Sequence, residues 1–90
     1  MCTYRTTAVS VRGSGKGAEG WFAVTDATVY FDHPVHAPAD HSLNIDVLNP
    51  SRGPSARVAL ELDPGSARAL AHAILETLES APQGLLADAG

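Results

Sequence analysis

The stretch RVALELDPGSARALAHAILETL, residues 57–78, decides the fold class. From Arg57 to Leu62, apolar side chains alternate with polar or small ones, a period of two that is typical of a β-strand with one buried face. Asp63 then suits the N-cap of a helix, and Pro64 suits the first helical position, where no backbone N–H is needed. The sequence therefore predicts a strand that leads directly into a helix.

The helix is predicted to end at Pro82 and Gly84, residue types that do not continue a helix. Its apolar residues recur at the helical period and form a single stripe. The stripe consists of Ala67, Leu70, Ala71, Ile74 and Leu78. We therefore interpret residues 1–84 as one domain and residues 85–90 as a flexible C-terminal tail.

Three more strands are expected before this stretch, at Thr3–Arg12, Gly20–Asp32 and Leu43–Leu48. The first two are separated by Gly13–Gly17, which reads GSGKG and predicts a hairpin turn. This glycine run resembles a phosphate-binding loop only superficially, because it lacks the required spacing and a strand, rather than a helix, follows it.

Residues 20–32 are apolar on both faces, as in a strand that is central in a sheet or covered by a partner. Alternation predicts one face with Trp21, Ala23, Ala27, Val29 and Phe31, and the other with Phe22, Val24 and Tyr30. A turn at Thr25–Ala27 would instead split the stretch in two. The expected fold class is α+β, with a small antiparallel sheet of four or five strands packed by one C-terminal helix.

Composition excludes several classes of function. The chain has 90 residues and a net charge of −4, and its basic residues are dispersed, so nucleic-acid binding is not expected. No apolar run is long enough to span a membrane and no signal peptide is recognisable, so a cytoplasmic location is expected. A chain this short has a small core, and its surplus apolar surface predicts a homodimer.

The segment DHPVHAPADH, residues 32–41, is the strongest candidate site. It contains three of the four histidines, His33, His36 and His41, and neutral imidazole is the commonest nitrogen ligand of transition metals. A fourth ligand could come from Cys2, Asp32 or Asp40. Zinc is the expected metal, although the spacing matches no established zinc signature. The alternative is a polar surface loop without metal.

Two residues outside this segment are candidates for catalysis. Cys2 is the only cysteine, and removal of Met1 would leave it as the N-terminus, where thiol and amine together could act as a nucleophile or metal ligand. Asp46 projects from a strand and could serve as a base or orient a histidine if it is covered. Alternatively, Cys2 is only a small residue of the strand, and Asp46 is a solvated carboxylate.

The motifs MCTY at residues 1–4, GSGKG at residues 13–17 and DHPxHAPxxH at residues 32–41 resemble those of a family of short bacterial proteins of unknown function. The resemblance spans nearly the whole chain. It implies a complete chain and brings no reaction or cofactor.

These observations lead to three hypotheses of function. The first is a small metal-binding protein with its site in the histidine loop, which as an enzyme would use the metal to act on a small molecule. The second is a non-enzymatic dimeric binding or regulatory module that uses the sheet face and Trp21. The third is a metal-free enzyme that uses His and Asp for acid–base catalysis.

Overall fold

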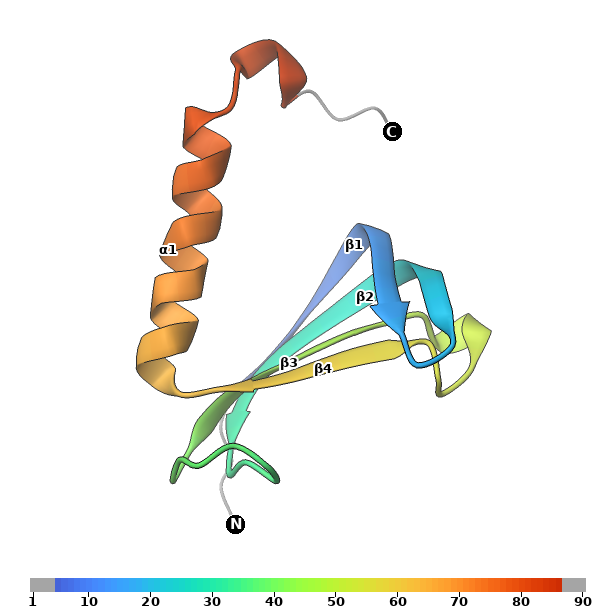
Figure 1. Cartoon of the computed structure of the whole chain (residues 1–90), viewed down its shortest axis with the longest axis vertical. Coiled ribbons are helices and arrows are strands. Elements are labelled where there is room, and N and C mark those ends of the chain that lie inside the picture. Colours follow the sequence, from blue (N-terminus) through green and yellow to red (C-terminus); the bar gives the residue numbers. More distant parts are fainter. Residues whose placement is uncertain (1–4, 87–90) are drawn as a thin grey trace.

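The computed structural model describes residues 5–86 of the chain. Its elements, in order, are β1 (Thr6–Gly17), β2 (Gly20–Asp32), β3 (Ser42–Leu48), the 3-10 helix η1 (Pro50–Arg52), β4 (Arg57–Leu62), α1 (Pro64–Ser80) and the 3-10 helix η2 (Gln83–Leu85). The strands form one antiparallel sheet in the order β1-β2-β3-β4, followed by the C-terminal helix (Figure 1). The α+β class is confirmed, and within the described residues the sheet has four strands.

The glycine-rich run is part of a strand, so the predicted hairpin turn at Gly13–Gly17 is wrong. β1 continues to Gly17 and the chain reverses afterwards. A Cβ atom at Gly15 would lie 3.1 Å from Cγ2 of Val24, and one at Gly17 would lie 3.1 Å from Cε1 of Phe22. Glycine is used here because buried side chains of β2 pack directly over the backbone of β1.

β2 is continuous, so the turn considered at Thr25–Ala27 does not form. Thr25 and Asp26 are instead two consecutive exposed residues, and the register of β1 against β2 shifts opposite them. Phe22 and Val24 pack with Val47, the cross-strand partner of Ala27. The predicted grouping of Trp21 with Ala27 is wrong: the Trp21 side chain is 70% exposed.

The hydrophobic core is small and lies where the sheet curls. Its buried apolar residues are Phe22, Val24 and Ala56, with Val11, Val47 and Val58 packed against them. Asn49, also buried, ties this end together: its side-chain amide donates to the carbonyl of Ala23 at 2.9 Å, and its side-chain oxygen accepts from the Ser51 N–H at 3.2 Å. The core therefore depends on very few large side chains.

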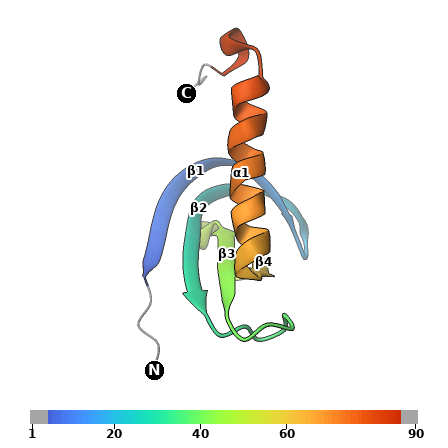
Figure 2. The same ribbon diagram turned by 90° about the vertical axis from the view of Figure 1, so that its left-hand side faces the viewer.

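α1 begins as the sequence predicts. The Asp63 side chain caps it by accepting from the backbone N–H of Ser66 at 2.8 Å and from its hydroxyl at 2.9 Å, and Pro64 follows directly. The helix then rises away from the sheet (Figures 1 and 2), and none of its residues is buried. α1 therefore packs on the sheet only in part. Within residues 5–86, no helix is long and apolar enough to cross a membrane.

A groove remains between α1 and the apolar face of the sheet. Its volume is about 540 Å³. From the sheet it is lined by Val29, Phe31, Leu43 and Ile45, and from the helix by residues that include Leu70 and Ile74. The apolar stripe of the helix thus faces the sheet across open space.

The close approach at Gly17 predicts a loss of stability on substitution. In Gly17→Ala the new Cβ would lie 3.1 Å from both Phe22 Cε1 and the backbone oxygen of Ser55. We expect the free energy of unfolding, measured by urea denaturation, to fall by about 1–3 kcal/mol. Gly13→Ala is the matched control, because nothing lies within 4 Å of its Cβ position. Equal effects of the two substitutions would contradict this explanation.

Candidate metal site

Strand pairing brings the two ends of the histidine loop together. Asp32 at the end of β2 pairs with Ser42 at the start of β3. His33 and His41 are the next residues outward on each side, so the base of the loop places them close to each other. Their proximity follows from an antiparallel register rather than from their separation in sequence.

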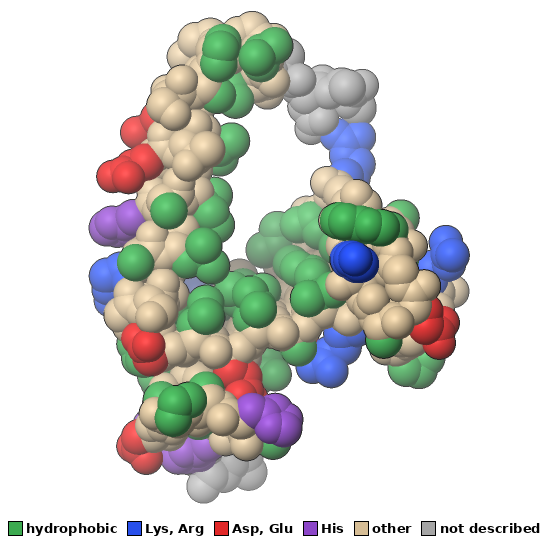
Figure 3. Space-filling model, viewed as in Figure 1, with side chains coloured by type: hydrophobic (Ala, Val, Ile, Leu, Met, Phe, Trp, Pro, Cys, Tyr) green, Lys and Arg blue, Asp and Glu red, His purple; other side chains and the backbone are tan. Residues whose placement is uncertain are grey.

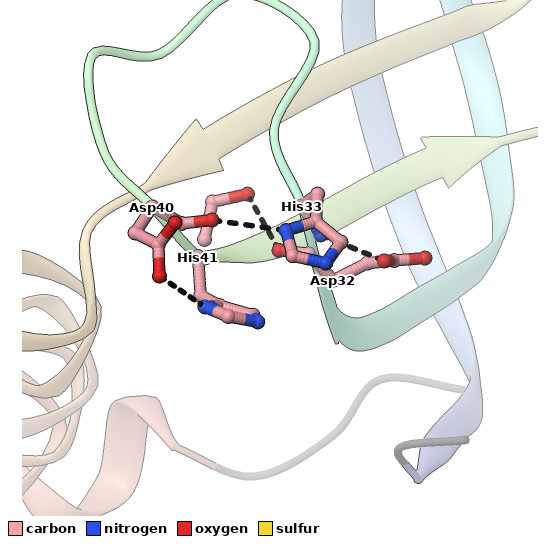
Figure 4. A network of polar contacts seen from close by, with 5 residues as sticks. Asp32, His33, Asp40 and His41 are labelled. Atoms are coloured by element: carbon pink, nitrogen blue, oxygen red, sulfur yellow. Dashed lines mark hydrogen bonds and ion pairs between the residues drawn. The ribbon is translucent and has the colours of Figure 1, made fainter. Parts of the chain in front are cut away.

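Three side chains at this base could hold a metal ion. Ligand atoms of His33, Asp40 and His41 all lie within 4.8 Å of one another. Nδ1 of His41 is 3.2 Å from Oδ2 of Asp40, and Nδ1 of His33 is 3.1 Å from the backbone oxygen of Asp40 (Figure 4). The two imidazole rings are 4.3 Å apart between centroids. Two nitrogen ligands and one carboxylate thus converge.

Neighbouring residues hold the His41 ring and the backbone of His33. The Phe31 ring stacks on the His41 ring, with centroids 5.5 Å apart and planes 9° from parallel. The Asp32 carboxylate accepts from the backbone N–H of His33 at 2.7 Å. Asp32 therefore fixes the backbone of His33 and does not belong to the cluster itself.

The tip of the loop is held by a residue of another strand. The Glu61 carboxylate, on β4, accepts from the backbone N–H groups of Val35, His36 and Ala37 at 2.8, 2.8 and 2.9 Å. These three hydrogen bonds favour the charged form and lower the pKa of Glu61 below its ordinary value. One carboxylate therefore anchors a loop that is otherwise without regular structure.

This anchor predicts how the loop responds to acid. A carboxyl whose pKa is lowered by folding stabilises the structure above its unfolded pKa, and that contribution is lost as the pH falls through the folded pKa. We therefore expect the amide resonances of Val35, His36 and Ala37 to titrate together, with a midpoint below the ordinary glutamate value of about 4.3. In Glu61→Gln, which cannot titrate, the common transition should disappear. A midpoint above the ordinary value would contradict the anchor.

His36 does not join the cluster. It lines a different cavity, of about 550 Å³, together with Tyr30, Arg57 and Glu61. This cavity lies on the sheet face opposite the α1 groove, because Tyr30 and Val29 are adjacent in β2 and point to opposite sides. Cys2 lies outside the described residues.

Asp46 lies beside this second cavity. Its Oδ1 is 2.6 Å from an Nη atom of Arg57, and its charge acts on the nearby Tyr30 hydroxyl. Burial, and then the nearby Asp46 charge, raise the pKa of Tyr30 above its ordinary value. The Tyr30 hydroxyl therefore stays protonated at neutral pH.

Comparison with known proteins identifies the family alone. Residues 1–87 match the model of a family of unknown function, DUF6295. The chain belongs to this family. No curated protein and no solved structure matches it. The family therefore indicates no chemistry for this member of DUF6295, and the residues of the site are the basis for any proposal.

Two structural features of the site are not evident in the sequence. From the sequence, Glu61 is expected to be only an outward-facing residue of a strand, although in the structure it anchors the loop. Phe31 reads as a core residue, although its ring stacks on His41. Glu61 follows the loop residues that it contacts by 24 to 26 positions, so no local sequence signal could have indicated the first of these.

Proposed function

We propose that this protein binds one divalent transition metal ion, most suitably zinc, through His33, Asp40 and His41. The observation that carries the proposal is the convergence of three ligand atoms within 4.8 Å at the base of one loop. Imidazole nitrogen and carboxylate oxygen are both established zinc ligands. The set lacks thiolate in the described residues, which favours zinc over the softer copper(I).

The surroundings support a preorganised site. The β2–β3 register fixes both ends of the loop, and the Glu61 carboxylate fixes its tip. Phe31 holds one ligand ring by stacking. Preorganisation of this kind reduces the conformational entropy that metal binding would otherwise cost.

Three protein ligands leave one coordination position for water or substrate, as in catalytic zinc sites. The side chains of His33 and Asp40 are exposed, so a small molecule can reach that position. Zinc there would supply Lewis acidity and a more acidic water. We therefore extend the proposal to hydrolytic or Lewis-acid chemistry on a small molecule.

The test is a zinc titration followed by NMR of the four histidine rings. We expect saturation at one equivalent per chain, with large shifts of the ring signals of His33 and His41. The ring signals of His36 and His72 serve as internal controls and should stay nearly unchanged, because neither residue is in the cluster. Equal shifts at all four rings, or no saturation, would contradict the proposed site.

A second candidate is a metal-free site for a small polar molecule in the cavity beside Asp46. It is favoured by the convergence of Tyr30, His36 and Arg57 on that cavity. Asp46→Asn tests it, because weakening the contact with Arg57 should alter ligand binding there without changing zinc uptake. The second site would be excluded if a small-molecule screen found no ligand whose affinity differs between the wild type and Asp46→Asn.

A further inference from the structure

The apolar stripe of α1 is not covered by the described chain. The side chains of Leu70, Ile74 and Leu78 are 39%, 52% and 50% exposed. Figure 3 shows hydrophobic side chains along the inner side of the helix and on the sheet opposite, with a hollow between them. Apolar surface of this extent on a small protein marks an interaction site.

The accessible surface and the radius of gyration of the chain also indicate an open structure. Its accessible surface is 6756 Å², about a third more than the roughly 5,000 Å² expected for a compact monomer of this mass. Its radius of gyration is 14.8 Å, against about 12 Å for a compact domain of this length. The chain is therefore more open than a compact monomer of its length.

The chain has little freedom to close the groove by itself. Only Asp63 separates β4 from α1. Its side chain is engaged with Ser66 in the helix cap, and Pro64 restricts the backbone at the first helical position. The direction in which the helix leaves the sheet is therefore set locally, and residues 5–86 leave the groove open.

Charge along α1 indicates which partner fits. Arg68 lies near the beginning of the helix and Glu79 near its end, and neither has an ion-pair partner within residues 5–86. Glu79 lies in the last turn, where the helix dipole disfavours an acidic residue. At 100° per residue, the two side chains project from the same flank of the apolar stripe.

We propose that α1 pairs with α1 of a second copy of this chain in an antiparallel, two-fold symmetric dimer. With Ile74 at the symmetry axis, Leu70 meets Leu78 of the second copy, and these side chains fill the groove. The same arrangement brings Arg68 next to Glu79 of the second copy, twice in the dimer. In a parallel two-fold pairing the same flank of the two helices would project on opposite sides of the interface, and Arg68 would not meet Glu79 of the second copy.

Light scattering and native mass spectrometry of the full chain test this dimer. We expect twice the 9.3 kDa chain mass. Ile74→Glu should give a monomer, whereas Ala69→Glu, which places the same charge on the opposite side of the helix, should remain a dimer. Circular dichroism checks that both variants are folded. A wild-type monomer, with or without a bound apolar small molecule, overturns the proposal.

A charge exchange tests the antiparallel direction without disturbing the core. We expect Arg68→Glu to raise the dimer dissociation constant about tenfold, because two exposed ion pairs become repulsive. The double variant with Arg68→Glu and Glu79→Arg should restore wild-type dissociation. Failure of the second change to rescue the first, or a dimer that survives Ile74→Glu, would overturn this arrangement of the helices.

Discussion

Phe22→Ala is expected to lower the free energy of unfolding by about 3–5 kcal/mol, the usual effect of removing a buried aromatic side chain. Phe22 is the largest member of a core whose other buried apolar residues, within residues 5–86, are Val24 and Ala56. A domain is typically stable by about 5–15 kcal/mol, so the loss is a large share of the total. The measurement is urea denaturation monitored by circular dichroism at fixed protein concentration.

Trp21→Ala is the matched control for this prediction. Trp21 is the adjacent residue and the larger side chain, but it is 70% exposed. We expect its removal to change the free energy of unfolding by less than about 1 kcal/mol, as for most exposed positions. If Trp21→Ala were as destabilising as Phe22→Ala, the placement of the core on Phe22 and Val24 would be wrong.

His41→Ala is expected to weaken zinc binding by more than about a hundredfold, because loss of a direct ligand should exceed the 10- to 100-fold cost of losing an outer-sphere partner. His41 contributes a ring that Phe31 orients and that lies 3.2 Å from Asp40. Calorimetric titration of zinc into the untagged protein measures the change.

His36→Ala is the control within the same loop. Its backbone N–H is held by Glu61 and its ring is outside the cluster, so the substitution keeps the anchor and the three ligands. We expect its zinc affinity to equal that of the wild type within about threefold, less than the loss of even an outer-sphere partner would cause. Equal losses in the two variants would mean that the ligand set differs from the one proposed.

The ends of β4 and α1 could be predicted from sequence because local chemistry determines them. The alternation from Arg57 to Leu62 specifies a strand, and Asp63 and Pro64 specify where the helix begins. β3 was predicted to within one residue for the same reason. These elements depend on neighbours in the sequence, and no distant contact overrides them.

The paired strands β1 and β2 could not be predicted correctly from local patterns. The run from Gly13 to Gly17 resembles a turn, but glycine is needed there because Phe22 and Val24 pack over the strand. The register of β1 against β2 also shifts between Ser10 and Gly13, where β1 has one residue more than β2. Both effects arise from pairing between strands, which no single stretch of sequence contains.

The candidate site was predicted in part. The sequence indicated the loop at residues 32–41, and the structure brings together two of its three histidines with Asp40, which was considered only as one possible fourth ligand. His36 was grouped with the others by proximity in sequence, but the fold of the loop turns it toward the opposite face of the sheet. The structure does not place Cys2, so its predicted role stays a prediction.

The most direct test of the metal site is elemental analysis of the protein purified without a histidine tag or chelator. The site predicts about one equivalent of zinc or another divalent transition metal per chain, retained in His36→Ala and lost in His33→Ala. Less than a tenth of an equivalent in the wild type, with no uptake when zinc is added, would contradict it.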